Sequence, residues 1–248
     1  VSMGLMNHIF GDQIDMGLVF LKVLYLHPQR ALPILCLVSS ERQTGKTTFL
    51  NWMQMIFGDN YVQINPEDIT SSFNSAYATK NIVALDETVI DKSHAVEKIK
   101  SLATTKSISV NQKFVANYSI PFFGKIIICT NKEKDFMRID EEEIRFWVRK
   151  VKSIEKINTK IENQLKNEIP KFLKFVADGH EIDFSRSRMV FTPQEIQNDS
   201  LKIVQKESWS WLKKEIYILI NEFFNTNSGL KTFQCTAVDM KNEWFLKQ

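Results

Sequence analysis

Nine consecutive residues combine the groups that a phosphate-binding loop needs. They are Ser40, Glu41, Arg42, Gln43, Thr44, Gly45, Lys46, Thr47 and Thr48. Successive backbone N–H groups at the start of a helix attract anions, a lysine beside them can reach the β- and γ-phosphates, and a threonine hydroxyl can bind Mg²⁺. We therefore expect this segment to bind a nucleotide, with Lys46 on the phosphates and Thr47 on the metal.

The residues on either side of this loop favour the same interpretation. The five apolar residues Ile34–Val38 predict a strand buried on both faces, and apolar residues recur at helical spacing from Phe49 to Phe57. One position departs from the usual pattern, because Ser40 stands where a glycine is expected and its Cβ restricts the backbone. The alternative is an ordinary surface loop followed by a helix.

Two adjacent acids, Asp86 and Glu87, end a second buried strand that begins at Ile82. We expect this strand to lie parallel to the first one and next to it, so that their carboxyl ends meet. Asp86 there can hold Mg²⁺ through water, and Glu87 can polarise an attacking water. The alternative is a strand that simply ends in solvated acids.

A third buried strand, Lys125–Asn131, ends in an asparagine. Asn131 can orient the attacking water, or it can only cap the following turn. Arg145 follows an acidic run over residues 140–143, which we interpret as a solvated face. From the order of the preceding motifs we expect Arg145 at a subunit edge, where an arginine can reach a neighbour's γ-phosphate, with Arg149 as the substitute candidate.

The polar stretch Asn111–Phe114 separates two alternating segments, Ser107–Val110 and Val115–Ile120, which predict a hairpin. Lys113 and Phe114 near its tip are the residue types that grip single-stranded nucleic acid, because lysine binds phosphate and an aromatic ring stacks on a base or sugar. The alternative is a tip that contacts only solvent.

The rest of the chain predicts mainly helices. We expect them over residues 11–27, 95–103 and 154–178, and one or two more from the capping box at Thr192 to about Phe224. We expect the apolar residues of the last region to form core rather than a stacking platform; they include Trp209, Trp211, Leu212, Ile216, Ile220 and Phe223.

These segments give a domain scheme. We expect an N-terminal helical segment (1–31), a nucleotide-binding core (32–152), a C-terminal helical region (153–226) and the start of a small unit (227–248) that is cut short. Because the first residue is Val1, we also expect the chain to be a piece of a longer polypeptide.

Composition sets bounds on the function. The chain has 248 residues, of which 44% are hydrophobic and 25% charged, and its net charge is +3. These values are ordinary for a soluble globular protein, and no apolar run is long enough for a membrane span. The 3 cysteines and 4 histidines lack the spacing of a metal site. We expect a soluble, cytoplasmic protein with buried thiols.

Five motifs together resemble those of superfamily 3 helicases, an AAA+ group found in small DNA viruses, phages and plasmids. They are SERQTGKTT (40–48), IVALDE (82–87), SISVNQKF (107–114), IIICTN (126–131) and EIRFWVRKV (143–151). The stretch LYLHPQRALPILCLVSSERQTGKTTFLNWM is especially similar to primase-helicases of phages and mobile elements. The resemblance covers about residues 10–215.

The resemblance implies an α/β fold, with an AAA+ P-loop core around a parallel sheet, and a hexameric ring that binds ATP and Mg²⁺ between subunits. It assigns phosphate and Mg²⁺ binding to Lys46 and Thr47, Mg²⁺ binding and water activation to Asp86 and Glu87, γ-phosphate sensing to Asn131, the arginine finger to Arg145 and the DNA contact in the pore to Lys113 and Phe114. It further implies single-stranded DNA as a partner, an N-terminal primase part in the full-length chain, and the cytoplasm of a bacterial host.

The leading hypothesis is therefore an ATP-driven DNA helicase module. One alternative is a nucleotide-dependent assembly or loading switch that unwinds nothing, although such a switch requires neither Glu87 nor Arg145. Another is DNA binding through the C-terminal helices, against which the small net charge argues.

Overall fold

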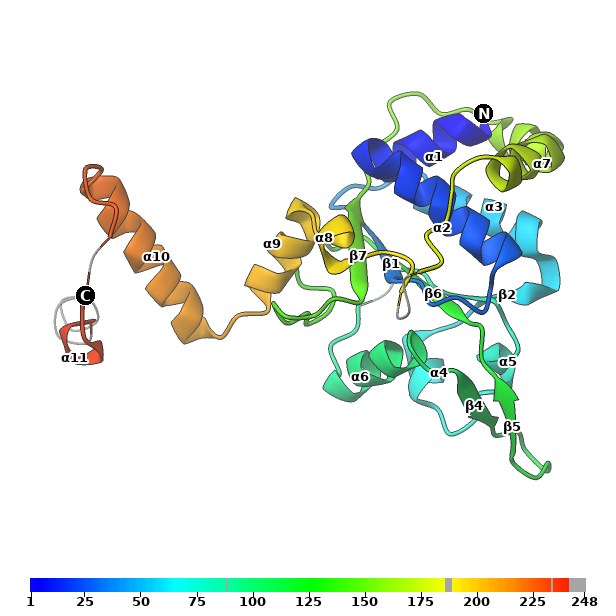
Figure 1. Cartoon of the computed structure of the whole chain (residues 1–248), viewed down its shortest axis with the longest axis horizontal. Helices are drawn as coiled ribbons and strands as arrows, with labels where there is room; N and C mark the ends of the chain where they lie inside the picture. Colours follow the sequence, from blue (N-terminus) through cyan, green and yellow to red (C-terminus); the bar gives the residue numbers. More distant parts are fainter. Residues whose placement is uncertain (88, 186–188, 233, 241–248) are drawn as a thin grey trace. The chain divides into compact units, whose positions relative to one another are not determined.

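Five parallel strands form the central sheet (Figure 1). The computed structural model describes residues 1–87, 89–185, 189–232 and 234–240, and the chain divides into two units, Val1–Glu207 and Ser208–Gln248. The sheet belongs to the first unit and has the order β2-β3-β6-β1-β7. The strands are β1 (Ile34–Val38), β2 (Tyr61–Gln63), β3 (Ile82–Leu85), β6 (Lys125–Thr130) and β7 (Phe146–Lys150).

Both faces of the sheet are covered, which is why its strands read as continuous apolar runs. In β1, Leu35 and Leu37 enter one core cluster, whereas Ile34, Cys36 and Val38 enter the other. This alternation follows from the two-residue period of a strand. The expected third strand, from Lys125, is therefore found as β6, and all six of its residues are buried.

Helices from distant parts of the chain cover one face (Figure 1). They are α1 (Ser2–Phe10), α2 (Ile14–Leu26), α3 (Lys46–Phe57) and α7 (Ile161–Asp178), with the 3₁₀ turns Gly11–Gln13 and Gly58–Asn60 beside them. Their shared core is aromatic: Phe10 stacks on Trp147 of β7 at 5.1 Å between ring centroids, and Trp52 packs against Phe172 at 5.3 Å.

The opposite face is covered by shorter helices. They are α4 (Pro66–Thr70), α5 (Ser75–Ala78), α6 (Ser93–Leu102) and α9 (Asp199–Glu207). A separate antiparallel hairpin of β4 (Ser107–Val110) and β5 (Tyr118–Pro121) adjoins this layer. Asn74, at the N-terminal end of α5, holds the hairpin: its side chain donates to the Ser109 carbonyl oxygen at 2.8 Å and accepts from the Asn111 N–H at 2.8 Å.

The C-terminal elements bear out one prediction and contradict another. α8 (Pro193–Ile196) begins with the predicted capping box, in which Glu195 N–H donates to Thr192 Oγ1 and Thr192 N–H donates to Glu195 Oε2.

The second unit contains α10 (Trp211–Thr226) and α11 (Ala237–Met240). No residue of α10 is buried, so the prediction that its apolar side chains form core is wrong in this unit. Residues 241–248 of the expected small C-terminal unit lie outside the described residues.

Several predicted boundaries differ from the observed ones. The helix predicted from residue 154 begins only at Ile161, and the one predicted from residue 11 begins as a 3₁₀ turn. The second hairpin strand starts at Tyr118 rather than Val115. Helices α1, α2 and α7 share one hydrophobic core with the sheet, so these segments pack together with the strands of residues 34–150.

Candidate functional site

The expected phosphate-binding loop connects β1 to α3. Gly45 immediately precedes α3 with a φ of 81°, a left-handed conformation in which a Cβ is strained, and a Cβ there would lie 3.0 Å from the Ile154 side chain. Two loop carbonyls are held from outside: Gln43 O accepts from the Ile154 N–H at 3.0 Å, and Thr44 O accepts from His8 Nε2 at 2.9 Å. Glycine at position 45 is thus required by the backbone and by the packing.

Lys46 is buried at the start of α3, with 5% of its surface exposed. Its ammonium donates to Ser39 Oγ, to Thr44 Oγ1 at 3.2 Å and to Asn131 Oδ1 at 2.9 Å. Burial lowers the pKa of Lys46, because removing the charge from water disfavours the ammonium form. These three oxygens are neutral, and the nearby carboxylates of Asp86, Glu87 and Glu133 oppose the effect of burial on the Lys46 pKa.

Asp86 and Glu87 follow β3 at the same edge of the sheet. Burial raises the pKa of Asp86, while hydrogen bonds from the Glu87 N–H (2.9 Å) and from the Thr47 side chain oppose that shift. Glu87 is exposed and has a φ of 51°. For a residue other than glycine this conformation is unfavourable, and such strain clusters at functional sites.

The sheet order corrects one prediction. We expected the acidic strand next to β1, but β6 lies between β1 and β3 and pairs with both. Because all three strands are parallel, their carboxyl ends still meet at one edge, and the insertion places Asn131 between the loop and the acids. The predicted convergence of Lys46, Asp86 and Asn131 is therefore observed.

A cavity of about 670 Å³ opens at this edge. It is lined by Arg42, Gln43, Thr44, Gly45, Lys46, Thr47, Thr48, Glu87, Val89, Thr130, Asn131 and Lys132. Seven of the nine predicted loop residues thus face a single cavity. Ser40 and Glu41 instead border a smaller cavity of about 220 Å³, together with Glu133 and Lys150.

Glu133 is a site residue that sequence reasoning missed. Its carboxylate accepts from the Ser40 N–H at 3.0 Å and hydroxyl at 2.9 Å, and from Lys150 Nζ at 3.0 Å. Burial acts to raise the pKa of Glu133, but these hydrogen bonds outweigh it and hold the pKa below its usual range. Glu133 has no motif of its own. Lys150, by contrast, ends a parallel strand, and a position at the carboxyl end of a strand could have identified Lys150 itself.

The two arginine candidates lie apart from this cavity. Arg145 immediately precedes β7, at the amino edge of the sheet, and its guanidinium binds both carboxylate oxygens of Glu143, at 2.6 and 2.8 Å. Arg149 bonds the Gln13 side chain and Asp12, the latter at 2.7 Å. The structure therefore brings neither arginine to the cavity of its own chain, and their action on a neighbouring subunit stays a prediction.

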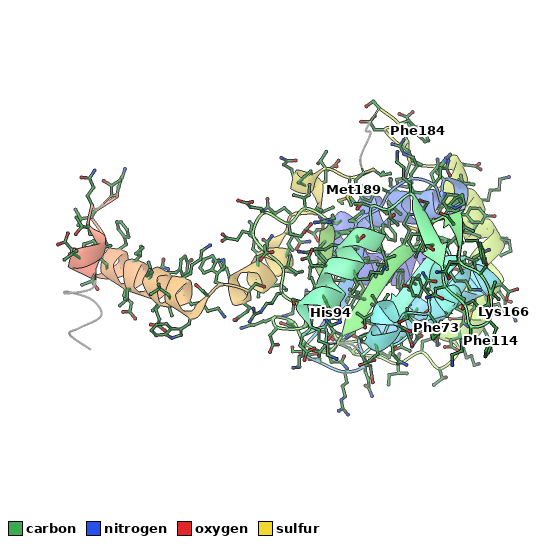
Figure 2. All side chains as sticks on the ribbon, turned by 90° about the horizontal axis from the view of Figure 1, so that it is seen from below. Phe73, His94, Phe114, Lys166, Phe184 and Met189 are labelled. Carbon is green, nitrogen blue, oxygen red and sulfur yellow. The ribbon has the colours of Figure 1, made fainter. Side chains whose placement is uncertain are left out.

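The hairpin presents both predicted nucleic-acid residues to solvent. Phe114, labelled in Figure 2, is fully exposed with a φ of 64°. Lys113 Nζ lies 5.5 Å from the ring centroid of Phe73. Phe73 is itself 44% exposed. Lys113 and Phe114 of the hairpin, with Phe73 from the connection between α4 and α5, thus offer one cation and two accessible rings, groups suited to phosphates and bases.

Among the described residues, no cluster of three or more His, Cys, Asp or Glu side chains could hold a metal ion by itself. Mg²⁺ commonly binds through one or two protein oxygens plus substrate phosphates, and Thr47 and Asp86 supply a hydroxyl and a carboxylate of that kind. No helix within the described ranges is long and apolar enough to span a bilayer.

Comparisons with known proteins show the fold. A family of unknown function, DUF5906, matches residues 37–149. No curated protein matches the chain. The apo structure of the NrS-1 C-terminal region has a TM-score of 0.72 and 18% identity, and the match covers 93% of this chain and 59% of that one. The A-form apo structure of the same region has a TM-score of 0.70 and 20% identity, and the match covers 90% of this chain and 55% of that one. The chain thus spans less than two thirds of these structures, and the likeness shows a shared fold.

Proposed function

We propose that this chain is an ATPase that drives movement along single-stranded DNA, the helicase module of a viral or mobile-element replication protein. The observation that carries this proposal is the convergence of Lys46, Thr47, Asp86 and Asn131 at one edge of the sheet, beside a cavity of about 670 Å³. The five helicase-like motifs and the fold shared with the NrS-1 C-terminal region support a role in replication.

The lining of the cavity fits a nucleoside triphosphate with Mg²⁺. The buried ammonium of Lys46 donates only to neutral oxygens, while the carboxylates of Asp86, Glu87 and Glu133 act on it from further away, and a phosphate would be a charged partner in direct contact. Thr47 and Asp86, already hydrogen-bonded to each other, would hold Mg²⁺. The metal, when bound, neutralises charge that develops on the phosphates.

The remaining polar groups have separable roles in hydrolysis. Glu87 lines the cavity with an exposed carboxylate and is the base that orients and polarises water. Asn131 bonds Lys46 and so connects the phosphate-binding lysine to the strand between the loop and the acids. General-base assistance of this kind contributes about 10²–10⁴-fold to a rate.

One observation favours the alternative, an assembly or loading switch. Arg145, the expected finger, is held by Glu143 of its own chain at the sheet edge opposite the cavity. A switch needs only nucleotide binding, whereas a motor in a hexameric ring needs an arginine that reaches the neighbouring subunit.

Replacing the general base tests the ATPase. We expect Glu87→Gln to bind ATP within about threefold of the wild-type affinity and to lose at least about a hundredfold in kcat. Lys46→Ala should lose binding as well, and Glu67→Gln, an exposed acid on α4, serves as the matched control. Hydrolysis by Glu87→Gln at the wild-type rate would remove Glu87 from the mechanism.

Strand separation distinguishes the motor from the switch. A forked duplex with a fluorophore and quencher at its end reports unwinding in the presence of ATP and Mg²⁺. We expect unwinding by the wild-type chain and its loss in Lys113→Ala. ATP turnover without any unwinding, in an assembled ring, would favour the switch.

A further inference from the structure

A second large cavity lies at the amino edge of the sheet, away from the nucleotide cavity. Its volume is about 600 Å³, and three connections line it: residues 29–31 between α2 and β1, 102–106 between α6 and β4, and 122–125 between β5 and β6. Lys125 begins β6, whereas the nucleotide cavity lies where β6 ends. The two cavities are therefore at opposite edges of one sheet.

The lining of this cavity is basic. Arg30, Lys106 and Lys125 supply three positive side chains, and none of the lining residues is acidic. Arg30 also lies over the Phe184 ring, 5.7 Å from its centroid, so a phosphate would be an additional partner for it. Phe123 adds an aromatic ring that is 39% exposed. Cations and an accessible ring without carboxylates match a ligand that carries phosphates and flat bases.

Lys125 is the most informative of these residues because only 6% of its surface is exposed. Its ammonium donates to the carbonyl oxygens of Pro28 (2.7 Å) and Phe123 (2.6 Å), which leaves one of its three protons for a ligand. No carboxylate among the described residues forms a salt bridge with it. Burial lowers the pKa of Lys125 to about 8, and a nearby anion would relieve that penalty.

The hairpin connects this cavity to the exposed tip. Ser107 pairs with Pro121 at the base of the β4–β5 ladder, and the Phe122 N–H donates to the Lys106 carbonyl at 3.0 Å, which continues the ladder to the cavity wall. Strands of four residues span roughly 13 Å, so the tip that carries Lys113 lies within a few nucleotides of the cavity.

We propose that this cavity binds the phosphodiester backbone of the single-stranded nucleic acid that contacts the hairpin tip. Arg30 and Lys106 bind the phosphates at the cavity mouth, Lys125 supplies a fixed charge from within, and Phe123 packs against a base or sugar. The inference rests on the proposed function, since it names a second contact for the same strand.

Equilibrium binding without nucleotide tests the inference. Fluorescence anisotropy of a labelled oligothymidylate is measured over a range of salt concentrations for wild type, Lys106→Ala and Arg30→Ala, with Lys174→Ala on α7 as an exposed control lysine. We expect each cavity variant to bind about 3–10-fold more weakly, and its slope of log affinity against log salt to fall by about 0.7 for each lost phosphate contact. Variants with the affinity and slope of Lys174→Ala would overturn the proposal.

A photo-crosslinking oligonucleotide locates the contact. We expect crosslinks at residues 104–106 or 122–123 in addition to the tip, and crosslinks confined to the tip would overturn the proposal.

Pyrophosphate serves as the probe for free phosphate. If pyrophosphate removes the cavity crosslinks and sodium chloride of equal ionic strength does not, the ligand of the cavity is a free phosphate and not a strand. None of these measurements depends on ATP turnover, so a chain without ATPase activity would refute the proposed motor and leave this result interpretable.

Discussion

At the scale of single residues, Ser40 and Glu133 together fix the position at which the loop after β1 begins. The candidate phosphate-binding loop begins with a serine whose backbone N–H and hydroxyl both donate to one carboxylate oxygen of Glu133, and Lys150 Nζ lies 3.0 Å from both oxygens of that carboxylate. Hydrogen bonds to a charged partner contribute about 1.5–3 kcal/mol. Glu133 therefore holds the start of the loop where glycine is absent.

Removing this carboxylate should weaken nucleotide binding. We expect Glu133→Ala to raise the Kd for ATP by roughly tenfold, equivalent to about 1.4 kcal/mol, because the loop start loses its anchor. Glu133→Gln keeps the shape and should lose only two- to threefold. Titration with a fluorescent ATP analogue measures both, with Ser40→Gly to separate the hydroxyl from the backbone bond. Wild-type affinity in Glu133→Ala would contradict the anchoring role.

The convergence of Lys46, Asp86 and Asn131 could be predicted from the sequence for a physical reason. Lys46, Asp86 and Asn131 each follow a buried strand, and parallel strands bring their carboxyl ends to one edge. Glu133 could not be predicted in this way, because it lies in a loop and its hydrogen-bond partners Ser40 and Lys150 are distant in sequence. Pairings of this kind depend on tertiary structure alone.

At the scale of elements, Gln13 joins three parts of the first unit. Its side-chain oxygen accepts from Trp147 and Arg149 of β7 and from Asn198 before α9, and its amide donates to the Glu195 carbonyl at 2.8 Å. One amide thus connects the α1–α2 turn, the edge strand and the C-terminal helices.

Loss of Gln13 should therefore destabilise the first unit. We expect Gln13→Ala to lower the free energy of unfolding by about 2–4 kcal/mol, because it leaves several partly buried donors without their acceptor. Asp12→Ala is the neighbouring control: Asp12 is 81% exposed, so loss of its ion pair with Arg149 should cost at most about 1 kcal/mol. Urea denaturation followed by tryptophan fluorescence measures both, and equal losses would contradict this role of Gln13.

Some elements were visible in the sequence and others were not. Strands β1, β3 and β6 have four or more consecutive apolar residues, but β7 has only Phe146, Trp147 and Val148 before two basic residues, and we assigned no strand there. The position of β6 between β1 and β3 was also not predicted, because the order of strands depends on crossover connections that the pattern of apolar residues does not encode.

At the scale of the whole molecule, the position of Arg145 bears on assembly. Arg145 and the nucleotide cavity lie at opposite edges of the sheet, separated by the five-residue strand β7, which spans roughly 16 Å. In the proposed ATPase, Arg145 would therefore act on the nucleotide of a neighbouring subunit, and its bonds to Glu143 would have to open first.

Mixed assemblies test this arrangement. We expect Arg145→Ala and Lys46→Ala subunits to be inactive separately, and their mixture to recover part of the ATPase activity, because some interfaces then combine an intact loop with an intact arginine. Steady-state phosphate release over a range of mixing ratios measures the recovery, and light scattering verifies that the subunits assemble. The absence of recovery at every ratio in an assembled mixture counts against a finger in trans.

The two contacts that hold the loop carbonyls have a thermodynamic consequence. His8 on α1 and Ile154, between β7 and α7, are distant in sequence, and each fixes one peptide group of the loop before any ligand is present. Ordering a free backbone residue costs about 1–2 kcal/mol. Folding already orders these two peptide groups, so in the proposed ATPase the binding energy of the phosphates would not be consumed in shaping this part of the loop and would remain for discrimination among ligands.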